Sequence, residues 1–167
     1  MAEYIGSHQG ESNSVAREYP VASGVTVYDN DFVYLDATGR VSSAAIAGKR
    51  LLGTVLGGPN NAAALATART YTPTAVGDAP GSVTVLVNIE SEARFLIKCD
   101  NVTNVLSEAS QGQYFNLIGN PGAQLVSGIS KSATAGQLVC LKFNPGIRGT
   151  DATYGIFAVA QGQLELG

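Results

Sequence analysis

Few residues of this chain have side chains suited to catalysis, and they do not gather into a known catalytic pattern. The one histidine, His8, lies in a polar N-terminal stretch, where nothing predicts the rigid, water-excluded setting that favours general-base catalysis. A hydrolytic triad needs a His beside its nucleophile, and the chain has no second His to supply one. We therefore predict no catalytic residue and no enzymatic activity.

The densest acidic cluster consists of Asp29, Asp31 and Asp36. Carboxylates at short spacing can bind Ca²⁺, but an EF-hand loop here would need Asp or Asn at position 33 and Gly at position 34. Val33 and Tyr34 occupy these positions. Asp side chains in turns bond nearby backbone amides, and this role explains the cluster better than a bound cation. We predict no metal site.

Glu90, Glu92 and Arg94 stand at alternating positions before a hydrophobic run. Paired carboxylates serve as acid and base in glycosidases. Here the spacing places them on one face of an extended segment, where Arg94 offsets their charge. We interpret the group as a solvated strand edge.

Composition argues against several classes of partner. The net charge is −3, and 10 basic residues against 13 acidic ones form no basic patch, so nucleic-acid binding is not expected. The Gly-rich stretches lack the G-x-x-x-x-G-K-[ST] phosphate cradle, and we expect no cofactor. No apolar run reaches the 18 or so residues of a membrane helix. The N-terminus has no signal-peptide pattern, so we expect synthesis in a cytoplasm and no membrane partner.

The two cysteines, Cys99 and Cys140, lie in strand-like runs at 95–99 and 138–143. We interpret them as small buried hydrophobic residues in a reducing compartment. A disulfide between them remains open, whereas two thiols and one distant His do not make a metal site.

The chain from Val21 onward is dominated by short runs of β-branched and aromatic residues between turn residues, a pattern typical of all-β folds. No helix long enough to connect parallel strands appears, so we expect a mostly antiparallel small barrel or sandwich. The predicted strands are Val25–Tyr28, Phe32–Leu35, Val41–Ile46, Leu51–Leu56, Val83–Val87, Phe95–Cys99, Gln113–Ile118, Gln124–Val126, Leu138–Phe143 and Tyr154–Gln161.

Finer features divide the chain further. Within the last predicted strand, Gly155, Phe157 and Val159 share one face, and Tyr154, Ile156 and Ala158 share the other. Gly119–Gly122 carries the strongest turn signal.

Short helices are expected near 61–69 and 102–109. Residues 1–18 are polar and show no periodicity that defines an element. We expect them to form an extended N-terminal arm that orders against a partner, with a disordered terminus as the alternative. Residues 19–167 are expected to form one β domain with possible sub-sheets at 20–58 and 81–165.

The order of these motifs resembles a known group of proteins. The first half resembles the small β module of phage head decoration (cement) proteins, and the second half resembles virion structural proteins of tailed phages. The likeness covers roughly 20–160 and departs at the N-terminal arm and at 161–167. It rests on Gly24–Asp29, Asp31–Leu35, Gly39–Val41, Leu52–Val55, Phe95–Asp100, Gln111–Leu117 and Val126–Ser130.

The resemblance implies a non-enzymatic structural protein with a β-tulip-like or related decoration fold. Such a protein is a homotrimer that binds the capsid exterior and clamps neighbouring major capsid subunits. Glu3, Tyr4 and Ile5, near the tip of the arm, are the candidate capsid-binding residues, because an extended arm can add to a sheet edge. The alternatives are a phage tail or head–tail connector β-barrel protein, and an extracellular ligand-binding or adhesive β domain.

Overall fold

The computed structural model describes residues 3–7, 15–43, 48–57, 70–71, 83–100, 106–143, 146 and 153–160. Within these residues the regular structure consists of strands and two short 3₁₀ helices, η1 (Glu108–Ser110) and η2 (Gly128–Ser130). Every pair of neighbouring named strands is antiparallel, which confirms the predicted all-β, mostly antiparallel architecture. The helix expected at 61–69 lies outside the described residues. The helix expected at 102–109 is described only from residue 106 onward, and there the short helix η1 overlaps its end.

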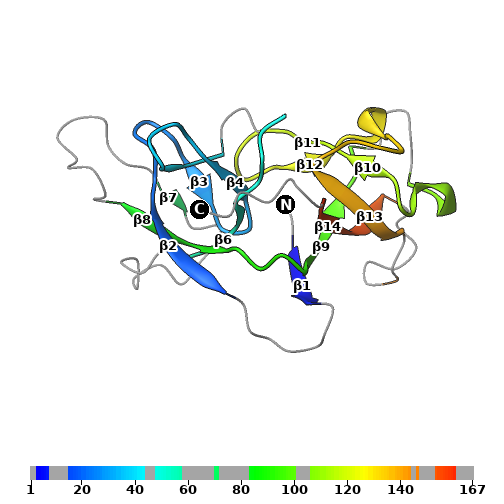
Figure 1. Cartoon of the computed structure of the whole chain (residues 1–167), viewed down its shortest axis with the longest axis horizontal. Helices are drawn as coiled ribbons and strands as arrows, with labels where there is room; N and C mark the ends of the chain where they lie inside the picture. Colours follow the sequence, from blue (N-terminus) through cyan, green and yellow to red (C-terminus); the bar gives the residue numbers. More distant parts are fainter. Residues whose placement is uncertain are drawn as a thin grey trace.

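Two five-stranded sheets lie side by side along the long axis of the molecule (Figure 1). Sheet I has the order β1 (Glu3–Ser7), β9 (Ala93–Lys98), β14 (Tyr154–Val159), β13 (Leu138–Phe143) and β10 (Tyr114–Phe115). Sheet II has the order β2 (Ala16–Pro20), β8 (Thr84–Asn88), β6 (Gly53–Gly57), β4 (Phe32–Leu35) and β5 (Val41–Ser42). Two small ladders join β11 (Leu117–Ile118) with β12 (Leu125–Val126), and β3 (Val27–Tyr28) with β7 (Thr70–Tyr71).

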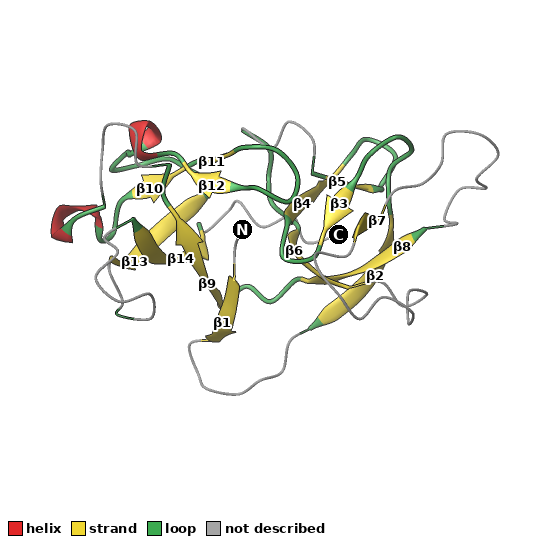
Figure 2. Ribbon diagram, turned by 180° about the vertical axis from the view of Figure 1, so that it is seen from behind, coloured by secondary structure: helices red, strands yellow, loops and turns green. Residues whose placement is uncertain are grey.

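The N-terminal region takes part in both sheets. β1 pairs with β9 at the edge of sheet I, and β2 pairs with β8 at the edge of sheet II. The expectation that residues 1–18 contain no regular element is therefore wrong at these strands. Sheet II also includes β8, from the second predicted range (81–165), so strands of the two predicted ranges are interleaved. Figure 2, which views the molecule from the opposite side, shows that β1 and β2 belong to different sheets.

Each sheet covers its own cluster of buried side chains. The cluster on sheet II consists mainly of valines, which suit the pleated surface of a strand, and the cluster on sheet I holds four phenylalanines. Phe32 comes from β4 of sheet II but packs edge-on against Phe95 of sheet I, with ring centroids 4.8 Å apart. The two sheets therefore share part of one core.

Two buried glutamines connect segments that are far apart in sequence. Gln124 donates from Nε2 to the carbonyl of Phe32 (2.9 Å) and accepts the Phe32 backbone N–H at Oε1 (2.7 Å). Gln137 donates to the carbonyl of Lys49 (2.7 Å) and accepts the N–H of Leu117 (3.0 Å). Because buried backbone groups must find partners, these side chains complete hydrogen bonding that the strand ladders leave open.

The turn between β11 and β12 extends this connection. The N–H of Ala123 bonds the carbonyl of Asn120 (2.9 Å), and Gly122 has a φ of +75°, the geometry of a type II turn with Pro121 at its second position. The predicted turn at Gly119–Gly122 is thus confirmed. The Gly122 N–H points at the Asp31 carboxylate, 2.8 Å from Oδ1.

We expect Gly122→Ala to lower the free energy of unfolding by about 2 kcal/mol. A left-handed backbone costs an L-residue roughly 1–2 kcal/mol, and the new Cβ would lie 3.0 Å from the Tyr28 ring. Gly39→Ala is the matched control, because Gly39 also has a φ of +75° but no atom lies within 4 Å of the position that its new Cβ would take. Urea titration of both variants separates the conformational cost from the ring contact. Equal losses would show that the Tyr28 contact contributes nothing.

Candidate functional site

The predicted capsid-binding residues lie on the outermost strand of sheet I. Glu3 pairs with Leu96 and Tyr4 with Phe95, whereas Ile5 is an extra residue in a bulge between Tyr4 and Gly6. In the order of sheet I, no described strand lies on the outer side of β1. An edge strand presents a row of free N–H and C=O groups, and bulges are one way in which proteins limit pairing there.

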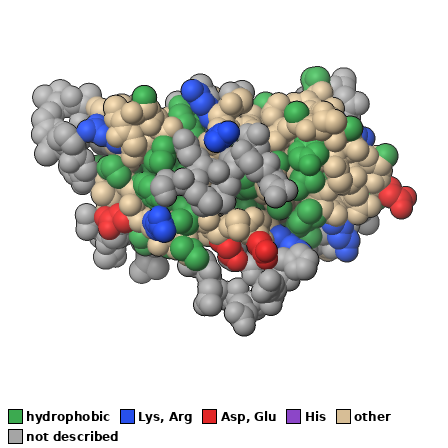
Figure 3. Space-filling model, viewed as in Figure 1, with side chains coloured by type: hydrophobic (Ala, Val, Ile, Leu, Met, Phe, Trp, Pro, Cys, Tyr) green, Lys and Arg blue, Asp and Glu red, His purple; other side chains and the backbone are tan. Residues whose placement is uncertain are grey.

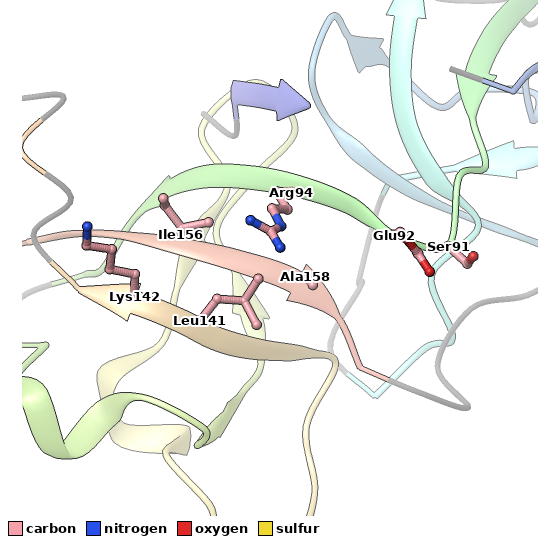
Figure 4. Close-up of a pocket in the computed structure, with 7 residues that line it drawn as sticks. All are labelled: Ser91, Glu92, Arg94, Leu141, Lys142, Ile156 and Ala158. Carbon is pink, nitrogen blue, oxygen red and sulfur yellow. The ribbon is translucent and has the colours of Figure 1, made fainter. Parts of the chain in front are cut away.

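The face of sheet I that points away from the core holds a depression of about 730 Å³. We call this depression the β14 trough. Figure 4 shows its lining side chains, which come from β9, β14, β13 and the two residues just before β9. They are Ser91, Glu92, Arg94, Leu141, Lys142, Ile156 and Ala158.

The floor and walls of the trough follow from strand register. Gly155, Phe157 and Val159 of β14 are buried, and the alternate residues Ile156 and Ala158 point outward, as the alternation in the sequence predicted. Ala158 pairs with Arg94 of β9, and Ile156 pairs with Lys142 of β13. Ala158 and Ile156 on the central strand thus lie between Arg94 on one neighbour and Lys142 on the other.

A β-bulge shapes the β13 wall. The pairing with β14 shifts between Cys140 and Lys142, so that Leu141 is an extra residue. Leu141 and Lys142 are consequently both exposed, and Phe143 returns to pack against the core. Without the bulge, the strict alternation of a strand would turn Lys142 toward the core. The bulge therefore places a cation and an apolar side chain together on the outer face.

The electrostatic character of the trough is mainly cationic. Arg94 and Lys142 face it, and Glu92 lies at one end (Figure 4). Among the described residues, neither cation has an ion-pair or hydrogen-bond partner. The interpretation of Glu90, Glu92 and Arg94 as a strand edge is wrong for Arg94, because β9 lies between β1 and β14.

Comparison of the chain with protein-family models, curated proteins and solved structures finds no match.

Two residues of the acidic cluster, Asp31 and Asp36, do what the turn interpretation predicts. The Asp36 carboxylate accepts the N–H groups of Thr38 (2.8 Å) and Arg40 (3.0 Å), and Asp31 accepts that of Tyr28 (3.0 Å). Within the part of the chain that the structure describes, no three His, Cys, Asp or Glu side chains are grouped as metal ligands. No helix among the described residues is long and apolar enough to cross a membrane.

The cysteines are free thiols within the sheet I core. Cys99 is 1 % exposed and Cys140 is fully buried, which confirms their interpretation as buried hydrophobic residues. Burial raises the pKa of the Cys140 thiol to about 11, and a thiol that stays protonated is a poor nucleophile.

Sequence reasoning missed the trough as a site. The outward pattern of Tyr154, Ile156 and Ala158 was visible, but the neighbours of that strand were not. A possible signal was the Leu141–Lys142 pair, where the alternation of the predicted strand 138–143 breaks. Such a break marks a bulge, and bulges occur preferentially near functional sites.

Proposed function

We propose that this chain is a non-enzymatic structural protein of a phage virion, which binds the outer surface of the capsid and clamps neighbouring major capsid subunits. The open edge of β1 carries the proposal. A segment of a capsid subunit would add to sheet I beside β1 by main-chain hydrogen bonds, the mode known as β-augmentation. Glu3, Tyr4 and Ile5 would then lie at the contact.

Two further features support this role. The sheets share a core and are connected by buried hydrogen bonds, which gives an attached strand a rigid base. Charged residues make up only 14 % of the chain, and Figure 3 shows them scattered in small groups over the face that it presents. Surfaces depleted in Lys, Glu and Asp resemble the cores of interfaces. A β-tulip-like or related decoration fold is part of the proposal.

The proposed assembly is a homotrimer, as the resemblance to decoration proteins implies, and in such an assembly several weakly bound arms held together multiply their affinity. Light scattering at tens of micromolar protein measures the oligomer directly. A monomer that persists when capsids are present would contradict this part of the proposal.

We expect the purified protein to co-sediment with undecorated phage heads. Proline variants test whether the edge of β1 makes the contact. Adjacent residues of a strand point their N–H groups to opposite edges of that strand. Proline has no N–H group. One of the two variants Glu3→Pro and Tyr4→Pro therefore removes a hydrogen bond to β9, and the other removes a donor from the open edge of β1. The variant that keeps the wild-type melting temperature should lose head binding.

The outcomes of this experiment are distinct. Full head binding by the thermally unaffected variant would rule out attachment through the edge of β1. Co-sedimentation of the wild type with tails would assign it to the tail, and retention on a glycan column without binding to heads would make it an adhesive domain.

A further inference from the structure

We propose that the β14 trough is a binding site for an extended, acidic segment of a partner polypeptide, whose carboxylates pair with Arg94 and Lys142. This proposal does not rest on attachment through β1, because the trough lies on the face of sheet I and not at its edge.

The shape of the trough fits one extended chain. Its floor is the outward side of β14, and its walls stand on the two neighbouring strands, β9 and β13. Adjacent strands lie about 4.8 Å apart, so the backbones beneath the walls are separated by about 10 Å. One strand takes up about 4.8 Å in this direction, so this separation is about twice the width of a single strand. A single strand-like segment laid along β14 therefore has room between Arg94 and Leu141.

The charge of the trough selects an acidic ligand. Arg94 pairs with Ala158 on one side and with Gly6 of β1 on the other, so no long side chain on either paired residue covers its guanidinium. Lys98, four residues further along β9, lies over the Tyr154 ring, 5.9 Å from its centroid, and is not one of the residues that line the trough. Guanidinium groups bind carboxylates through two parallel hydrogen bonds.

The spacing of the two wall cations matches that of acidic side chains in an extended peptide. Arg94 and Lys142 lie opposite Ala158 and Ile156 respectively, two residues apart along β14. This separation is about 7 Å along the strand, the same as that between side chains i and i+2 of an extended chain. Carboxylates at alternate positions can thus reach both cations, and their methylene stems then cover Ile156 and Ala158.

A second copy of this chain and a nucleic acid fit the trough less well. Face-to-face contact between two copies would bring like cations together, which opposes association. Nucleic-acid affinity depends on the number of phosphates neutralised, and the described outer face of β9, β14 and β13 offers only Arg94, Lys98 and Lys142.

The test uses a fluorescently labelled short peptide of alternating Glu and Thr, with anisotropy measured in low-salt buffer. We expect wild-type protein to bind it and the double variant Arg94→Gln/Lys142→Gln to bind about tenfold more weakly or worse, a loss of about 1.4 kcal/mol or more. Ala158→Tyr, which fills the floor without a change in charge, should weaken binding similarly. Both variants should retain the wild-type melting temperature.

Matched controls make the result specific. Arg17→Gln/Lys131→Gln removes the same two charge types from exposed positions outside the trough and should leave the affinity unchanged. The proposal is overturned if wild type fails to bind the peptide, if this control pair loses as much affinity, or if a Gln–Thr peptide binds equally well. Tighter binding of a thymidine oligonucleotide would assign the trough to nucleic acid instead. If the double variant fails to fold, Lys142→Gln alone, at an exposed position, decides the question.

Discussion

Gln124→Ala is expected to lower the free energy of unfolding by about 3–5 kcal/mol. The substitution leaves both the N–H and the C=O of Phe32 without their glutamine partner, in a residue that is fully buried. Each buried polar group left unsatisfied costs about 1–3 kcal/mol, and the vacated side-chain volume adds a cavity term. Equilibrium unfolding in urea measures the loss.

Two further variants separate the contributions at this position. Gln124→Met keeps most of the volume but makes no such hydrogen bonds, so it should retain most of the destabilisation. Gln111→Ala is the control, because Gln111 is exposed and such surface changes usually stay within about 0.5 kcal/mol. A Gln124→Ala protein within about 1 kcal/mol of the wild type would contradict the prediction, because it would show that the loss of these two hydrogen bonds costs little.

Stability is also expected to fall as the pH rises from about 4 to about 7, through Asp31. Burial raises the pKa of this carboxyl from 3.8 to about 6, although the N–H groups of Gly122 and Tyr28 oppose the shift. The folded state therefore holds its proton more tightly than the unfolded chain. The resulting stabilisation is fully present below pH 3.8 and is lost as the pH rises through about 6. A shift of this size corresponds to about 3 kcal/mol.

Asp31→Asn provides the measurement, because it removes the titrating group. Urea unfolding of wild type and variant at intervals across this pH range should give a difference that changes by about 3 kcal/mol. Asp36→Asn is the control. Burial tends to raise the pKa of Asp36, but hydrogen bonds from Thr38 and Arg40 outweigh it and lower the pKa below 3.8, so its contribution changes only at more acidic pH. A wild-type profile parallel to that of Asp31→Asn between pH 4 and 7 would contradict the prediction.

The sequence predicts best those strands whose ends are marked by neighbouring turn-forming residues. Phe32–Leu35 and Leu138–Phe143 form strands with the predicted limits. For Phe32–Leu35 the reason is local, because one turn precedes this strand and another follows it, between Asp29 and Gly39. Val25–Tyr28 shortens to β3, and Gln113–Ile118 divides into β10 and β11.

The remaining features depend on partners distant in the chain. β1 is polar, and it becomes a strand because β9, about ninety residues later, supplies its hydrogen bonds. Gln124 acquires its role from Phe32, 92 positions away. The trough likewise requires the order β9, β14, β13, which the alternation within a single strand does not encode, although the break in alternation at Leu141–Lys142 marks the bulge.

The central position of β14 in sheet I has a consequence for synthesis on the ribosome. β14 is the last of the described strands to be made, yet it joins β9 to β13. Until it leaves the exit tunnel, β1 with β9 and β13 with β10 are separate pairs, and two-stranded pairs are marginal in water. Sheet II has all its strands by Asn88 and can assemble earlier. A nascent chain stalled before residue 154 would thus expose the phenylalanines of the sheet I core to chaperones, whereas its N-terminal valine cluster would already be enclosed.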